Sequence, residues 1–85
     1  MDIQEILIKV KRANRHTGNY DDEILTELIY QVMEDMKGMG VLPSVLEDRV
    51  SIGAIAQGVW EKDNLHQYTQ DFKENVIRLR EKRGV

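Results

Sequence analysis

The sequence predicts an all-α fold, a compact bundle of four helices around a central apolar third helix. Three observations carry this prediction. Apolar residues recur at intervals of three and four, no segment alternates between apolar and polar residues, and the 85 residues include one proline and six glycines. Proline or glycine inside a helix would cost about 3 or 1 kcal/mol, so their scarcity favours long helices. At this length residues 1–85 are expected to form one domain.

The first predicted helix covers residues 2–14. Its apolar stripe consists of four residues at helical spacing: Ile3, Ile6, Leu7 and Val10. Asp2 is expected to cap the start of this helix, with Glu5 as its partner in a capping box. Cations crowd the other end, where they complement the helix dipole. Residues 17–20 are then predicted to form a turn.

The second predicted helix begins at residue 21 or 22 and ends near residue 37. Three consecutive acidic residues place negative charge at its positive end. Five of its residues are predicted to lie in the core: Leu25, Leu28, Ile29, Val32 and Met36. Gly38 or Gly40 is expected to supply the left-handed residue that ends the helix. Residues 41–42 are expected to fold back over its last turn.

The third predicted helix covers residues 44–62. Its segment 50–60 is apolar except for Ser51 and Gln57, which predicts that the helix is buried on most sides. Ser44 and Glu47 match a capping box at its start. Three of its residues are predicted to lie in the core: Val50, Ala54 and Trp60. Its glycines, Gly53 and Gly58, indicate a packing need, because alanine would otherwise be the better helix former.

A polar linker, residues 63–67, leads to the fourth predicted helix, residues 68–83. Its predicted core residues are Phe72, Val76 and Leu79. Arginine and lysine dominate its last turns, again at the end of the helix where cations are favoured.

The composition excludes several classes of protein. The sequence contains 12 Lys and Arg and 15 Asp and Glu. The resulting net charge of -3 argues against a dedicated nucleic-acid binder. The lack of cysteine excludes a disulfide scaffold and a thiolate metal site. No secretory signal or membrane span is visible, so we expect a protein without a membrane partner.

No pattern of residues predicts a catalytic or cofactor site. His16 and His66 lie in separate polar linkers without the spacing of metal ligands. The acidic run 21–23 is typical of a hydrated helix start rather than an acid–base pair. The sequence contains neither a nucleophile elbow nor a phosphate-binding loop. We therefore expect no enzymatic activity, no cofactor, no metal and no small-molecule substrate.

The distribution of charge is the most informative pattern. Residues 9–15 carry cations and no acid, residues 21–48 are strongly acidic, and residues 73–83 are basic. Charges matched to the helix dipoles explain this arrangement equally well. The alternative is a head-to-tail contact between copies, which closes into a ring where the rotation permits. The candidate interface residues are Lys9, Lys11, Arg12, Arg15, Asp21, Asp22, Glu34, Asp35, Arg78 and Arg80.

A small helical DNA-binding regulator is a second hypothesis. The basic C-terminal helix would then contact phosphates through its cations, Arg78, Arg80, Lys82 and Arg83. No helix-turn-helix spacing is evident, and the third predicted helix is too apolar to contact bases.

Several motifs together resemble a known family. They are Leu7-x-x-Val10-Lys11, Tyr20-Asp21-Asp22-Glu23-Ile24-Leu25-x-x-Leu28-Ile29, Met36-x-Gly38-Met39-Gly40-Val41, the apolar third segment, and Phe72 with Val76 and Leu79. Over nearly its whole length the chain resembles the small all-helical head-tail connectors, also called head-completion or DNA-packaging adaptors, of tailed bacteriophages and prophages.

This resemblance implies a structural protein of the virion neck, assembled in the cytoplasm of the bacterial host. Such connectors form a ring under the portal after DNA packaging and link the head to the tail. The implied partners are further copies of the chain, the portal protein and a tail-side or stopper protein. DNA would pass through the ring without specific binding. The resemblance implies no enzymatic activity and no cofactor.

Overall fold

The computed structural model describes residues 3–13 and 22–82. These residues form five α-helices and one turn of 3-10 helix, without a strand, which confirms the all-α class. The elements are α1 (Ile3–Ala13), α2 (Asp22–Gly38), α3 (Pro43–Leu46), η2 (Arg49–Ser51), α4 (Ile52–Asn64) and α5 (Gln70–Arg80). None of the described helices has the length and apolar character that crossing a membrane requires.

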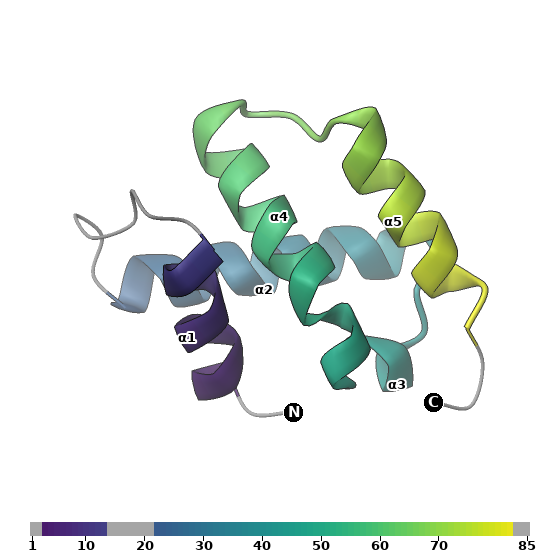
Figure 1. The fold of residues 1–85 in the computed structure, drawn as a ribbon, viewed down its shortest axis with the longest axis horizontal. Helices are drawn as coiled ribbons and strands as arrows, with labels where there is room; N and C mark the ends of the chain where they lie inside the picture. Colours follow the sequence, from purple (N-terminus) through teal and green to yellow (C-terminus); the bar gives the residue numbers. More distant parts are fainter. Residues whose placement is uncertain (1–2, 14–21, 83–85) are drawn as a thin grey trace.

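The helices form two layers. α4 lies in front of α2, with α1 on one side of α4 and α5 on the other (Figure 1). α4 packs against all three of these helices, and α3 with η2 connects the end of α2 to the start of α4. One side of α4 therefore faces the interior, and the opposite side is left between α1 and α5.

α1 is amphipathic, as its sequence predicts. Ile6, Leu7 and Val10 are buried, and Ile3 packs against the core from its edge. Ile8 lies on the outer face and is exposed. The predicted cap, Asp2, is outside the described residues.

The end of α2 is fixed by a Schellman motif. The amide of Gly40 donates to the carbonyl oxygen of Lys37, and the amide of Val41 donates to that of Met36. Gly40 has a φ of +103°, so it is the left-handed residue that the sequence predicts at Gly38 or Gly40. Val41 and Met36 are both buried, as this motif favours.

The predicted helix over residues 44–62 is wrong, because the chain breaks between α3 and α4. Pro43 begins α3, and Leu42 precedes it without a side-chain cap, so the predicted capping box at Ser44 does not form. The Asp48 side chain accepts from the amide of Val50. The buried Ser51 hydroxyl lies 2.8 and 2.9 Å from the carbonyl oxygens of Leu46 and Asp48 and donates its one hydrogen to either of them. These local hydrogen bonds compete with a continuous helix.

Most predicted core residues are buried, with three exceptions. Val50 is 41% exposed and Trp60 is 37% exposed, so both predictions are wrong, and Leu28 is only half-buried. Trp60 shares one outward stripe of α4 with the exposed Gly53, seven residues earlier in the chain. The confirmed core residues from the predicted set are Leu25, Ile29, Val32, Met36, Ala54, Phe72, Val76 and Leu79.

α5 starts later and ends earlier than the predicted range of 68–83. Thr69 caps it, and its hydroxyl accepts from the amide of Phe72. Tyr68 precedes the helix and stacks on Phe72 with the ring centroids 4.3 Å apart. Arg83 lies outside the described residues.

Candidate functional site

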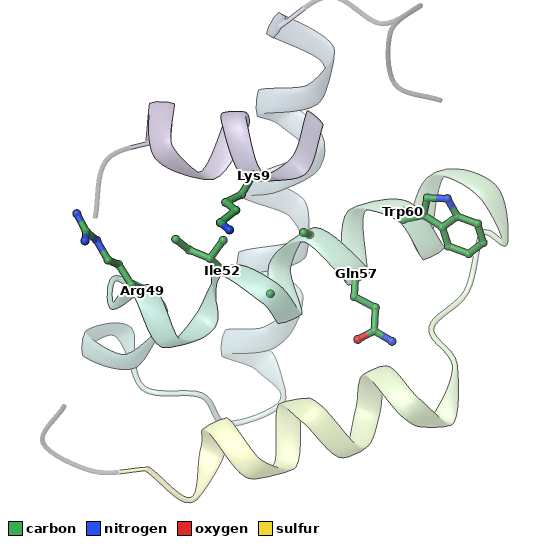
Figure 2. A pocket seen from close by; sticks show the side chains of 7 residues that line it. Lys9, Arg49, Ile52, Gln57 and Trp60 are labelled. Carbon is green, nitrogen blue, oxygen red and sulfur yellow. The ribbon is translucent and has the colours of Figure 1, made fainter. Parts of the chain in front are cut away.

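An open groove of about 720 Å³ runs along the outward side of α4, next to α1. It is lined by Lys9, Arg49, Ile52, Gly53, Ala56, Gln57 and Trp60. Figure 2 shows Lys9 reaching from α1 towards Ile52, with Arg49 at one end of the groove and Trp60 at the other. We refer to these seven residues as the α1/α4 groove.

The floor of the α1/α4 groove is apolar, and no side chain fills it at Gly53. Ile52 and Ala56 form part of it, and Trp60 presents one ring face at its end. A Cβ added at Gly53 would meet no atom within 4 Å. Glycine in this helix therefore leaves room for a side chain from outside the domain.

The rim of the groove is cationic. A smaller hollow of about 260 Å³ continues from the groove across α1 and is lined by Glu5, Ile8, Lys9, Arg12, Arg49 and Ile52. Arg49 pairs with Glu5 at 3.0 Å, but both side chains are well exposed, so the pair contributes little to stability. Within the described residues, Lys9 and Arg12 take part in no ion pair. Three cations against one carboxylate leave this rim positive.

A second surface, on the outer side of α2, has the opposite charge. Glu23, Glu27, Tyr30 and Glu34 are exposed and share one stripe, because they lie at helical intervals of three, four and seven residues. Tyr30 is 54% exposed in the middle of this stripe. Glu34 lies 3.9 Å from Lys37, a distant and exposed pair. We refer to the four residues as the α2 acidic stripe.

A polar network joins α4 to α5 under the groove. Glu61 is 4% exposed and accepts hydrogen bonds from the Thr69 amide at 2.6 Å, the Thr69 hydroxyl at 2.9 Å and the Gln57 side chain at 2.9 Å. Gln57 in turn accepts from Asn75 at 2.8 Å. Figure 2 shows Gln57 directed away from α1 and towards α5. These bonds satisfy the buried carboxylate and hold Thr69 in place as the cap of α5.

Asp35 belongs to a second network, between α2, α4 and the segment before α5. It accepts from Lys62 at 2.8 Å and from the Tyr68 hydroxyl at 2.5 Å. Burial alone would raise the pKa of Asp35, but the hydrogen bonds and the charge of Lys62 outweigh it and lower this pKa. Burial, the bond to Asp35 and the negative charges of Asp35 and Glu61 raise the pKa of Tyr68. Asp35 is therefore bound within the domain, where it joins α2 to Lys62 and Tyr68.

The other predicted interface residues have separate roles. Lys9 and Arg12 contribute to the groove and its rim, and Glu34 to the α2 acidic stripe. Lys11 instead pairs with Asp22 across the start of α2. Arg15 and Asp21 lie outside the described residues.

The two predicted interface residues on α5 do not reach the groove. Arg78 lines an adjoining hollow between α4 and α5, which shares Gly53 and Gln57 with the α1/α4 groove. Arg80 packs its aliphatic stem over Gly40, where an added Cβ would lie 2.8 Å from its Cδ. The structure therefore separates these two arginines from the cations of α1.

Of the eleven residues of the two surfaces, the sequence prediction named only Lys9 and Glu34 as interface residues. It missed nine: Glu23, Glu27, Tyr30, Arg49, Ile52, Gly53, Ala56, Gln57 and Trp60. A helical-wheel reading of α4 carries a usable signal, because Gly53, Gln57 and Trp60 fall on one stripe and Gln57 is polar. The same reading places Tyr30 among the acids of α2 and not among its apolar residues. The apolar character of residues 50–60 obscured the signal on α4.

The groove is suited to hold an apolar side chain flanked by acidic groups. It is open to solvent, its floor is apolar, and its charges sit at the rim, which is the anatomy of a protein-docking surface. Across the described ranges, no group of three or more His, Cys, Asp and Glu side chains could hold a metal ion. The chain matches no family model, no curated protein and no solved structure.

Proposed function

We propose that this chain is a structural protein of the phage virion neck, a connector that forms a ring under the portal and links the head to the tail. The proposal joins the resemblance of its motifs to head-tail connectors with one observation on the surface. That observation is the α1/α4 groove, an open apolar hollow with a cationic rim. We also propose that the helices of this connector are arranged as a bundle around a central helix.

The groove supports a docking role because its features favour a macromolecular partner. Small-molecule sites usually enclose most of their ligand, whereas this groove is open along α4. Exposed aromatic and arginine residues, here Trp60 and Arg49, are the side chains most enriched at the energetic centres of protein interfaces.

The charge of the chain is compatible with a channel wall. A chain with a net charge of -3 does not attract DNA overall, whereas a strongly basic lumen would bind phosphates and slow the passage of DNA. In this proposal the DNA passes without specific binding.

Deleting the gene from the phage or prophage that encodes the chain tests the proposal. We expect DNA-filled heads and separate tails by electron microscopy, with joined virions restored by supplying the intact gene. Purified chain should also bind the portal ring of the same phage. Normal virions from the deletion, at an unchanged yield, would overturn the proposal.

DNA binding by α5 is the second candidate. Lys73, Arg78 and Lys82 are exposed on or just after this helix, which favours phosphate contacts. Exposed Asp71 and Glu74 lie on the same helix and weaken the positive field. This leaves DNA binding the less supported function.

A titration of duplex DNA by fluorescence anisotropy separates the two functions. A DNA-binding regulator should lose affinity steeply with salt, and neutralising Arg78, Arg80 and Arg83 should abolish its binding. A connector should show no binding at low salt beyond that of a control protein of the same charge.

A further inference from the structure

We infer that the α1/α4 groove of one copy receives the α2 acidic stripe of a second copy, with Tyr30 seated beside Gly53. This inference rests on the proposed ring-forming function and names the two surfaces that would make each contact. Four observations carry it: the placement of the surfaces, their charges, the exposed tyrosine and the space at Gly53.

The two surfaces lie on opposite sides of the molecule. α4 and α2 pack against each other through their buried sides, Gly58 of α4 lying against Val32 of α2. Their exposed stripes must therefore face away from each other. Figure 1, which looks along the shortest axis, places α4 in front and α2 behind. A contact between unlike surfaces on opposite sides is heterologous, so it propagates from copy to copy and closes into a ring when the rotation allows.

The charges of the surfaces are complementary. Lys9, Arg12 and Arg49 surround the groove, and three glutamates surround Tyr30 on the stripe. Within the described residues, Glu23 and Glu27 form no ion pair. Opposite charges at the rim of a contact orient the partners and speed their association. Two copies meeting stripe to stripe, or groove to groove, would instead place like charges together.

Tyr30 matches the floor of the groove in size and character. Its ring is exposed on a helix, and an amphipathic helix that lays one face into an apolar groove is a recurrent mode of recognition. Gly53 leaves the floor open, and no packing inside the domain requires a glycine there. A side chain from a second copy, seated at this position, would explain why position 53 is a glycine.

Charge reversal gives the first test. One variant carries Lys9→Glu and Arg12→Glu, and the other carries Glu23→Lys and Glu27→Lys. Each variant alone should fail to associate, because one of its surfaces is reversed. A 1:1 mixture should associate again, since both kinds of contact between unlike variants pair opposite charges. Sedimentation velocity measures the association, and circular dichroism checks that each variant folds.

A control carries Lys73→Glu and Arg80→Glu, which lowers the net charge as much as Lys9→Glu with Arg12→Glu does, at exposed positions of α5 that do not line the groove. It should associate like the original chain. Association of both reversed variants on their own, or a control that loses association equally, would overturn the inference.

Cysteine trapping gives the second test and captures even a transient contact. The natural chain contains no cysteine, so a double variant with Glu27→Cys and Gly53→Cys keeps Tyr30 and carries one thiol on each surface. Under mild oxidation it should form a ladder of covalent oligomers on a denaturing gel. A double variant with Glu27→Cys and Glu74→Cys, whose second thiol is exposed on α5, should not exceed random cross-linking.

The two tests distinguish a failure of the inference from a failure of the proposed function. Binding to the portal ring without a ladder above the control overturns the inference and leaves the connector function in place. A specific ladder with no effect of gene deletion on virions supports the contact and overturns the connector function. Cross-linking of the groove to another protein in its place, with no ladder, also overturns the inference.

Discussion

Two glycines of α4 have opposite surroundings. A Cβ at Gly58 would lie 2.6 Å from Val32 and 2.7 Å from Phe72, so this glycine allows α2, α4 and α5 to approach one another. A Cβ at Gly53 would contact nothing. The same residue type therefore serves internal packing at one position and leaves an external surface open at the other.

Substituting each glycine with alanine should separate these roles. Gly53→Ala should leave the free energy of unfolding unchanged or raise it by up to about 1 kcal/mol, because alanine is the better helix former. Gly58→Ala should lower it by about 1–3 kcal/mol through overpacking. Urea denaturation of both variants measures the difference. Equal destabilisation by the two substitutions would contradict this account of Gly53.

Tyr68 links stability to pH through its bond to Asp35. The pKa of Tyr68 is raised in the folded protein, whereas in the unfolded chain it remains near about 10. Above that pH the unfolded chain loses the tyrosine proton first, so alkali favours unfolding. The contribution of Tyr68 is therefore complete below about pH 10 and is lost as the pH rises towards its folded pKa.

Tyr68→Phe should remove this pH dependence. Below about pH 10 the variant should be less stable by roughly 1 kcal/mol, because Asp35 loses a hydrogen bond. The difference from the original chain should shrink as the pH rises above 10. Urea denaturation between pH 8 and about 11.5 measures it, and lysine titration cancels because both proteins share it. A constant difference across this range would refute the role of Tyr68.

At the scale of elements, the break between α3 and α4 decides where the groove begins. η2 turns the chain so that Arg49 stands at one end of the groove and Ile52 enters its floor. The buried Ser51 hydroxyl holds this turn through the carbonyl oxygens of Leu46 and Asp48. A continuous helix would rotate Arg49 to a different position relative to α1.

Ser51→Ala should therefore destabilise the domain by about 1–3 kcal/mol, since the Leu46 carbonyl oxygen loses this buried donor, whereas the Asp48 carbonyl oxygen keeps the Ser51 amide. Thr26→Ala is the matched control, because its hydroxyl bonds the Asp22 carbonyl on a solvent-accessible part of α2. That change should be neutral within about 0.5 kcal/mol. Thermal denaturation followed by circular dichroism compares the two. A neutral Ser51→Ala would show that the turn does not depend on this hydroxyl.

The sequence predicts well those helices whose buried residues recur at the regular spacing of three and four residues. α1 and α2 have regular apolar stripes, and the glycine signal locates the end of α2 at Gly40. Residues 50–60 are apolar except for Ser51 and Gln57, and Ser44 with Glu47 matched a capping box. Both patterns favoured one helix over 44–62, so neither revealed the break at residues 47–51. Side-chain hydrogen bonds from Asp48 and Ser51 determine that break, and they depend on contacts absent from a periodic pattern.

The candidate site was predicted least well, because it depends on how helices lie against one another. Lys9 and Arg12 were identified by charge alone. Trp60 was predicted in the core because it is large and apolar, but α1 and α5 leave its side of α4 uncovered. Asp35 appeared to be a free acid, and its bonds to Lys62 and Tyr68 arise from residues 27 and 33 positions away.

At the scale of the whole molecule, charge is separated between faces although the net charge is only -3. The cations around the groove and the glutamates of the stripe are all exposed, so neither set contributes much to folding. Charges that do little for stability are available for association. Stability and assembly should therefore respond to different residues of this chain.

Tyr30→Ala should show this separation most clearly. The ring is more than half exposed, so its loss should change the free energy of unfolding by less than about 0.5 kcal/mol. A tyrosine at the centre of an interface commonly contributes at least about 2 kcal/mol, so association should weaken by roughly 30-fold. Ile77→Ala, which removes an exposed apolar side chain from α5, should leave association unchanged. Association can be measured by sedimentation velocity over a concentration series. It can also be measured by the yield of the covalent ladder when Glu27→Cys and Gly53→Cys are added to each variant. If Tyr30→Ala and Ile77→Ala associate equally well, the stripe is not the partner of the groove.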